Sequence, residues 1–290
     1  MSKKINHFIE LTRIKKPIGY MLLFWPCIWG LTIVYDFNNE LINFLKLTIL
    51  FFLGSILMRS AGCIVNDIVD RNYDKNVQRT KNRPIASGEV SVKLGLIYVT
   101  ILCLIALLVL LQFNKLTIIL ALASMPLAFS YPYMKRFTYW PQLFLGITFN
   151  YGLLLGWTSV QENLSLIPII FYIGAIFWTL GYDTIYGYQD IKDDEIIGVK
   201  STSIKFKNNP KKFLSLCYLF TLSSIIFIGL YMNFNNAYFL FLLIPAIHMF
   251  FQIKKLDIID GNMCLKIFKS NNILGLLIFV NLLIGKLISI

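Results

Sequence analysis

The chain has 290 residues, of which 57% are hydrophobic and only 14% are charged, and its formal net charge is +12. A soluble domain usually carries about 25% charged residues, so the composition excludes an ordinary soluble protein and indicates a polytopic membrane protein. In such a protein Lys and Arg gather in cytoplasmic loops, so the positive charge predicts no nucleic-acid partner. The five cysteines form no CxxC pair and the two histidines lie far apart, which indicates neither a zinc site nor a disulfide framework.

Nine apolar segments are long enough to cross a hydrocarbon core of about 30 Å, which takes about 20 helical residues. In chain order they are 17–35, 42–65, 94–112, 116–134, 138–157, 166–188, 213–232, 237–253 and 271–289. The sequence therefore predicts an all-α fold of about nine transmembrane helices, forming one transmembrane domain over residues 1–290.

The basic residues predict the orientation of these spans. The N-terminal tail and the segments after the second, fourth, sixth and eighth spans hold 23 of the 27 Lys and Arg residues. The positive-inside rule makes these segments, and the N-terminus, cytoplasmic. The segments 66–93 and 189–212 are the longest and most polar, which indicates a cap over a site on that face. The sequence has no clear targeting segment, which favours a bacterial inner membrane.

A first acidic cluster lies at the inner end of the second span. Asn66, Asp70 and Asp74 are spaced i, i+4 and i+8, so they share one face of a helix, and Asp67 sits beside them. Like charges at such spacings destabilise a helix by roughly 0.2–0.5 kcal/mol per pair. Mg²⁺ would offset this repulsion, because it binds one or two carboxylates and leaves its other positions to water and phosphate. The alternative is a solvated acidic helix end neutralised by neighbouring basic residues.

A second acidic cluster closes the sixth span. Asp183, Asp190 and Asp194 are spaced i, i+7 and i+11, which predicts one helical face again. The two clusters hold 8 of the 15 acidic residues of the chain, a concentration that surface solvation does not require. Both lie on the predicted cytoplasmic side, so the sequence predicts two cooperating sites for one or two Mg²⁺ ions.

Basic and aromatic side chains accompany both clusters. Arg79 and Arg83 follow the first cluster closely, and a guanidinium group matches phosphate with two parallel hydrogen bonds. Carboxylates, metal and arginines together indicate a diphosphate site, although ordinary cytoplasmic loop charge would give the same residues. Lys135 and Arg136 are candidates for binding diphosphate or a substrate carboxylate, with interfacial anchoring as the alternative. Arg59 lies inside the second span, where a charge usually faces a cavity or a partner unless it reaches to the interface.

Two sequence patterns resemble a known family. NDxxDxxxD at 66–74, followed by RTxxRPxxSG at 79–88, resembles the first motif of the UbiA superfamily of intramembrane aromatic prenyltransferases. The stretch 183–194, followed by 198–202, resembles its second motif. The stretches 16–26, 59–63 and 131–136 resemble the 4-hydroxybenzoate polyprenyltransferase branch.

This resemblance implies nine helices around a central cavity that opens to lipid, with Mg²⁺ as the cofactor. It implies polyprenyl diphosphate and 4-hydroxybenzoate as substrates, in ubiquinone biosynthesis. The metal-binding positions that it implies are Asn66, Asp67, Asp70, Asp74, Asp183, Asp190 and Asp194, of which Asp70, Asp74, Asp183 and Asp190 are also catalytic. The substrate-binding positions are Arg59, Arg79, Arg83, Tyr131, Lys135 and Arg136.

Two other functions remain open at this point. A sister prenyltransferase acting on haem, homogentisate or a naphthoate would differ only in its acceptor. A cation-coupled transporter would also use acidic residues, but these acids cluster at one face of the membrane rather than near its midplane. The sequence indicates neither the length of the prenyl chain nor the oligomeric state.

Overall fold

The computed structural model of the chain describes residues 3–38 and 41–288, and within these ranges it contains helices and no strand. The elements in chain order are α1 Lys3–Thr12, α2 Ile18–Val34, α3 Leu41–Asp74, α4 Val92–Leu110, α5 Lys115–Ser130, η1 Tyr131–Tyr133, α6 Met134–Phe137, α7 Pro141–Gln161, α8 Leu166–Gly187, α9 Ile191–Ile197, α10 Thr202–Lys205, α11 Pro210–Tyr231, α12 Asn236–Phe241, α13 Leu243–Lys255 and α14 Gly261–Ile288.

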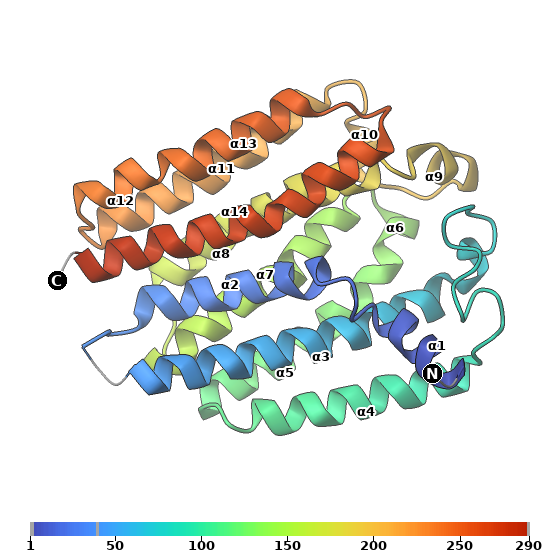
Figure 1. Cartoon of the computed structure of the whole chain (residues 1–290), viewed down its shortest axis with the longest axis horizontal. Helices are drawn as coiled ribbons and strands as arrows, with labels where there is room; N and C mark the ends of the chain where they lie inside the picture. Colours follow the sequence, from blue (N-terminus) through green and yellow to red (C-terminus); the bar gives the residue numbers. More distant parts are fainter. Residues whose placement is uncertain (1–2, 39–40, 289–290) are drawn as a thin grey trace.

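The long helices run side by side and form one bundle (Figure 1). In the part of the chain that the structure describes, eight helices are long and apolar enough to cross a membrane, with α5–α6 and α12–α13 each counted as one. The ninth, α2, has 17 residues and would span about 26 Å at 1.5 Å per residue. The predicted all-α, polytopic fold is confirmed, and each of the nine predicted segments has its helix.

Two predicted boundaries move by more than a few residues. Helix α3 continues to Asp74, so the first acidic cluster lies on the helix itself. Helix α14 begins at Gly261 rather than residue 271, because Asp260 Oδ1 accepts the backbone N–H groups of Asn262 and Met263, at 2.9 and 3.1 Å, and caps the helix.

For the second cluster, the prediction of one continuous helical face was wrong. Helix α8 ends at Gly187, and Asp190 precedes the separate short helix α9. The cause is close packing: Ser203 donates to the carbonyl of Thr184 at 2.8 Å, and a Cβ on Gly187 would collide with the Ser203 hydroxyl. The chain therefore turns at this point instead of continuing the helix.

Small residues let the central helices approach closely. A Cβ on Gly30 of α2 would meet the Leu153 carbonyl of α7, and one on Gly156 of α7 would meet the Cys27 carbonyl of α2. Such contacts drive helix association where lipid removes the hydrophobic effect between helices. Trp29 and Trp178 fill the adjoining core with ring centroids 4.9 Å apart.

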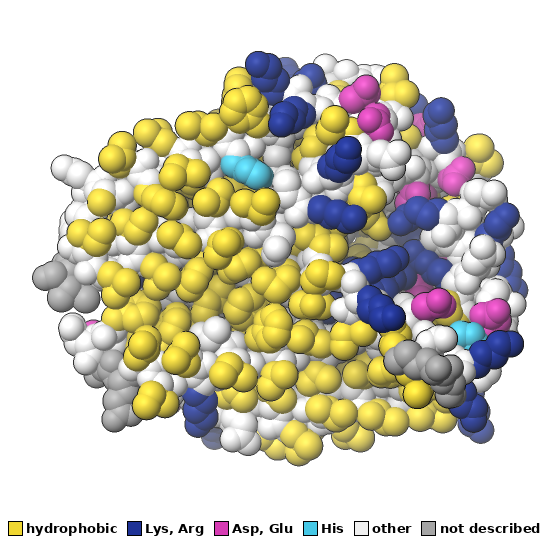
Figure 2. Space-filling view, in the orientation of Figure 1, with side chains coloured by type: hydrophobic (Ala, Val, Ile, Leu, Met, Phe, Trp, Pro, Cys, Tyr) yellow, Lys and Arg dark blue, Asp and Glu magenta, His cyan; other side chains and the backbone are white. Residues whose placement is uncertain are grey.

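Charged side chains gather at one end of the bundle, on the right in Figure 2, whereas hydrophobic side chains cover most of the rest of that face. Helices α1, α6 and α9 lie at this charged end (Figure 1). The last turns of α3 and α8 also reach it, and they carry the two acidic clusters. The fold therefore brings both clusters to the same end, as predicted.

Candidate active site

The first motif presents its polar side chains from the last turns of α3. Asn66 Nδ2 donates to the Tyr131 hydroxyl at 2.8 Å. Lys135 Nζ donates to Asp70 Oδ2 at 2.6 Å, from the short helix α6. The other oxygen of Asp70, Oδ1, is buried and has no hydrogen-bond partner among the described residues. Tyr131 of η1 thus supplies a hydroxyl group to this motif, and Lys135 of α6 supplies a cation.

Asp67 and Asp74 share a guanidinium group. Arg83 Nη1 lies 3.1 Å from Asp67 Oδ1 and 2.9 Å from Asp74 Oδ2. The same Asp67 oxygen also accepts from Arg13 Nη2 at 2.5 Å. Asp67 is only 2% exposed, so its charge is compensated inside the protein rather than by water.

The second motif is connected to the first by Arg79. Its guanidinium group forms two hydrogen bonds to the carboxylate of Asp190, with Nε to Oδ1 at 2.8 Å. It also donates from Nη1 to the Tyr186 hydroxyl at 2.9 Å and lies over the Tyr186 ring, 5.5 Å from its centroid. Asp183 has neither a hydrogen bond nor an ion pair among the described residues. The segment after α3 therefore contacts the turn after α8 directly.

Asp194 lies at the same end, on α9. Burial raises the pKa of its carboxyl group to about 6, and the neighbouring charges of Asp190 and Asp193 act in the same direction. Lys135 and Arg79 oppose that shift. The backbone N–H of Lys200 donates to the Lys135 carbonyl at 2.8 Å, which ties the segment after α9 to α6. Lys135 is therefore held from both motifs.

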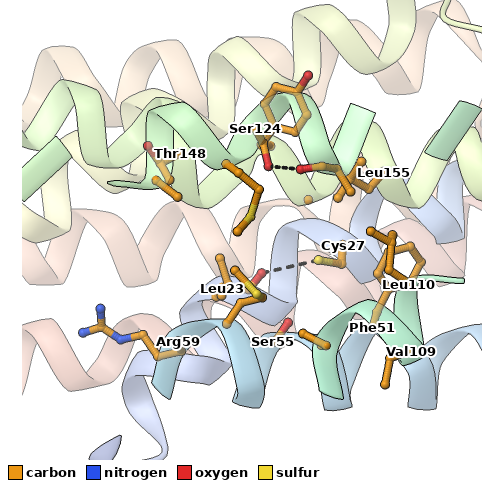
Figure 3. Close-up of a pocket in the computed structure, with 18 of the residues that line it drawn as sticks. Leu23, Cys27, Phe51, Ser55, Arg59, Val109, Leu110, Ser124, Thr148 and Leu155 are labelled. Carbon is orange, nitrogen blue, oxygen red and sulfur yellow. Dashed lines mark hydrogen bonds between the residues drawn. The ribbon is translucent and has the colours of Figure 1, made fainter. Parts of the chain in front are cut away.

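An apolar cavity of about 230 Å³ extends away from the charged end, between α2, α3, α4, α5 and α7. Figure 3 shows Arg59 at one end of it and Phe51, Val109 and Leu110 at the other. Tyr131 lines it too, so the cavity reaches the first motif through the Tyr131–Asn66 hydrogen bond. Leu107 of α4 and Leu122 of α5 line the cavity and are also exposed, which indicates an opening toward lipid between these helices.

The remaining predicted substrate residues differ in their surroundings. Arg59 lies over the Phe149 ring, 5.3 Å from its centroid, and is within electrostatic reach of Asp183. Within the described ranges it has no hydrogen bond and no ion pair. Arg136 instead donates to the Val69 carbonyl at 2.9 Å and lies over two tyrosine rings, so it holds α6 against α3. Of these two arginines, Arg59 is the one whose charge is available inside the cavity.

The donor set can be tested against the metal that the resemblance implies. Over residues 3–38 and 41–288, no three His, Cys, Asp or Glu side chains converge on one point. Mg²⁺ needs no such cage, because it commonly takes one or two carboxylates and completes its shell with water and phosphate oxygens. The unpartnered Asp70 Oδ1 and the unpaired Asp183 carboxylate are hard oxygen ligands of that kind. These residues fit a Mg²⁺ ion that is bound together with a phosphate-bearing ligand.

Sequence reasoning missed three contributors. Arg13 is one of the five basic residues of the N-terminal tail, and nothing in its sequence context distinguishes it from ordinary cytoplasmic charge. Tyr186 lies within the second motif, three residues after Asp183, and that position was the available signal. Phe149 is one of 24 phenylalanines, so no pattern marks it.

The fold and the site together define a multi-pass membrane protein with paired acidic motifs and cations at one end of a helical bundle. Residues 23–282 match the UbiA prenyltransferase family, and the chain belongs to it. The resemblance inferred from the two motifs is thereby confirmed.

Relatives match along nearly the whole chain. The chain is 40% identical over 290 residues to 4-hydroxybenzoate geranyltransferase 1 of Lithospermum erythrorhizon, covering 99% of this chain and 92% of that protein. It is 41% identical over 286 residues to the mitochondrial 4-hydroxybenzoate polyprenyltransferase of Bos taurus, covering 98% and 76%. A solved structure of a UbiA homolog from Archaeoglobus fulgidus bound to GPP and Mg²⁺ has a TM-score of 0.68 at 17% identity, covering 98% of this chain and 100% of that one. This structural similarity shows that the two chains share the same fold.

Proposed function

We propose that the chain transfers a polyprenyl group from polyprenyl diphosphate to the 3-position of 4-hydroxybenzoate, with Mg²⁺, in ubiquinone biosynthesis, and that residues 1–290 act as one domain. One observation carries the proposal: two acidic motifs with Arg and Lys partners lie beside an apolar cavity whose inner end holds the half-buried cation of Arg59. The full-length relatives named for this acceptor support the same reading.

The charged end fits the diphosphate. Asn66, Asp70, Asp74, Asp183, Asp190 and Asp194 would hold Mg²⁺, which would neutralise the charge that develops on a departing diphosphate. Asp67, whose Oδ1 is paired with both Arg13 and Arg83, is left out of the proposed ligand set. Arg79, Arg83 and Lys135 pair with these carboxylates. The same cations would turn to phosphate oxygens when the diphosphate binds. Cations fixed in advance around a leaving group stabilise the transition state more than they do the ground state.

The apolar cavity fits the prenyl tail. It runs from Tyr131 and Arg59 toward Phe51 and Phe113, whose rings pack 4.7 Å apart at its far end. Along α3, Arg59 and Phe51 are eight residues apart, or about 12 Å. The opening between α4 and α5 would let a longer tail continue into lipid. The tail would thus bind through apolar contacts and the shape of the cavity, without any charged partner.

Arg59 fits the carboxylate of the aromatic acid. A cation with no ion pair among the described residues, next to the Phe149 ring, offers a charged donor and an aromatic surface to a benzoate. With its carboxylate there, the acceptor ring would lie between Arg59 and the charged end. Tyr131, which lines the cavity together with Arg59, would border the same space.

The reaction that this arrangement supports is electrophilic aromatic substitution. The allylic C–O bond breaks, and the diphosphate leaves with the electron pair toward Arg79, Arg83 and Lys135. The ring carbon next to the hydroxyl-bearing carbon attacks the allylic carbon and forms the new C–C bond. Loss of the ring proton restores aromaticity. The apolar walls exclude water, which would otherwise capture the allylic cation.

We also propose that the charged end faces the cytoplasm across a bacterial inner membrane. The basic side chains gathered at that end support this orientation by the positive-inside rule. Helix α9 carries exposed side chains at Lys192, Glu195 and Ile196. We expect proteolysis at α9 in inverted but not in right-side-out vesicles; the opposite pattern would contradict this orientation.

The first experiment is prenyl transfer in membranes with 4-hydroxybenzoate, a polyprenyl diphosphate and Mg²⁺, with EDTA as the control. We expect 3-polyprenyl-4-hydroxybenzoate that disappears when EDTA is added. Product with homogentisate or a naphthoate but not with 4-hydroxybenzoate would overturn the acceptor. Absence of product with every acceptor would overturn the proposed function.

A further inference from the structure

Arg13, just after α1, reaches the first motif from outside both motif segments. Helix α1 packs on α3 and α4 through Leu11, which is 0% exposed, and through Phe8, whose ring lies edge-on to Tyr98 at 5.1 Å. His7 also lies 3.3 Å from Glu89 in the segment after the first motif. These contacts fix the end of α1 next to the charged end of the bundle.

The backbone at Arg13 adopts an unusual conformation. Its φ is +51°, in the left-handed region that glycine prefers and that other residues rarely occupy. Outside glycine, such conformations persist where surrounding contacts fix them, and they gather at functional sites. Here the surrounding contact is the 2.5 Å ion pair of Arg13 with Asp67. The strained turn after α1 therefore directs one guanidinium group onto one buried carboxylate.

Asp67 has two cations, whereas the other first-motif carboxylates have one each. Asp70 pairs with Lys135, and Asp74 pairs with Arg83. Arg83 is the second partner of Asp67 as well, so it bridges two carboxylates. If Arg83 turned to a phosphate oxygen without Arg13, Asp67 would become a buried and uncompensated anion, which is strongly unfavourable.

We propose that Arg13 is a positioning residue that keeps Asp67 neutralised and thereby leaves Arg83 free to bind the prenyl diphosphate. The inference rests on the proposed function, since it assigns Arg83 to the diphosphate. Arg13 itself contacts neither substrate. An arginine suits this role because its charge is permanent and its planar group binds a carboxylate in a fixed geometry.

The test is a double-mutant cycle on Arg13→Met and Asp67→Asn. In Arg13→Met, Arg83 stays on Asp67, so the KM for geranyl diphosphate should rise at least about tenfold while the KM for 4-hydroxybenzoate stays unchanged. Adding Asp67→Asn removes the anion that holds Arg83, so the double variant should recover most of that loss. A purely structural role for Arg13 would not separate the two KM values.

A binding measurement tests the diphosphate affinity separately from turnover. Calorimetric titration with geranyl thiolodiphosphate and Mg²⁺ should show binding weakened by the same factor in Arg13→Met and recovered in the double variant. The matched control is Lys15→Met, which removes an equal charge from an exposed position two residues along. Lys15→Met should bind like the wild type; equal weakening in this control would mean that total charge acts, and would overturn the inference.

Other results would also overturn the inference about Arg13 or the proposed function. Wild-type binding by Arg13→Met, or a double variant no better than Arg13→Met, overturns the inference. If Arg13→Met does not fold, the double variant is compared with the wild type, and binding weakened more than about tenfold overturns it. A wild-type chain that binds the thiolodiphosphate but prenylates no acceptor contradicts the proposed function alone.

Discussion

The charged end of the bundle and the apolar cavity beside it are built on different principles. At the charged end, Asp67, Asp70, Asp74 and Asp190 each accept from an Arg or Lys side chain. In the cavity, Arg59 is a cation without an ion pair in the part of the chain that the structure describes, and its neighbours are mostly apolar. The charged end is a network of ion pairs, whereas the cavity is a space lined mostly by apolar side chains.

This difference determines how each region should respond to substitution. A buried charge network fails when one partner is removed, because the remaining partner is left uncompensated. An apolar wall loses only contact area and volume when one side chain is shortened. We therefore expect large effects on turnover at the charged end and small effects on substrate preference in the cavity, with Arg59 between the two.

The largest effect is expected for the paired acids. Asp70→Asn or Asp190→Asn should lower kcat more than about 100-fold, because each removes a proposed metal ligand and the partner of a cation. Thermal unfolding without substrate should change little, because the partners Lys135 and Arg79 are 28% and 43% exposed and water can solvate them once they are unpaired. The control is Asp257→Asn, an exposed acid in the segment between α13 and α14, which should keep normal turnover. Near-normal kcat in either site variant would contradict the metal role.

Arg59→Met comes next. It should raise the KM for 4-hydroxybenzoate about 10- to 100-fold, the range expected for loss of a hydrogen bond to a charged group. The KM for the prenyl diphosphate should change much less. Arg59→Lys, which keeps the charge, should recover part of the loss. Equal increases in both KM values would argue that Arg59 serves the charged end rather than the acceptor.

Arg79→Lys probes the connection between the two motifs. It should raise the KM for the prenyl diphosphate about tenfold, because Lys cannot form both bonds to Asp190 while also reaching the Tyr186 hydroxyl. Tyr186→Phe removes only the hydroxyl and should have a smaller effect in the same direction. An Arg79→Lys enzyme with wild-type KM would show that the bidentate geometry is dispensable.

The smallest effect is expected at the far end of the cavity. Phe51→Ala should shift the ratio of kcat/KM between a long and a short prenyl diphosphate by about threefold in favour of the longer one. The matched control is Phe52→Ala, because Phe52 packs on Tyr20 and Phe24 and does not line the cavity. A ratio that moves equally in both variants would remove Phe51 from the tail site.

The first motif could be predicted almost completely from the sequence, and the second could not. Asn66, Asp70 and Asp74 lie on an uninterrupted helix, so their shared face follows from spacing alone. Asp190 and Asp194 lie beyond a turn that depends on Ser203 packing against the end of α8. That contact joins Ser203 to Thr184, 19 residues earlier in the chain, and the spacing of residues within the acidic stretch does not predict it.

By itself, the sequence determined the nine apolar segments, the end of the bundle that carries charge, and the acidic and basic residues that meet there. Hydrophobic length and charge placement are local quantities, and lipid leaves few alternatives to helices of that length. Only the tertiary structure decided which cation pairs with which carboxylate, that Arg13 is among them, and that the cavity lies between α2, α3, α4, α5 and α7. Pairing and cavity shape depend on how distant helices pack, and the spacing of residues along one chain does not contain that information.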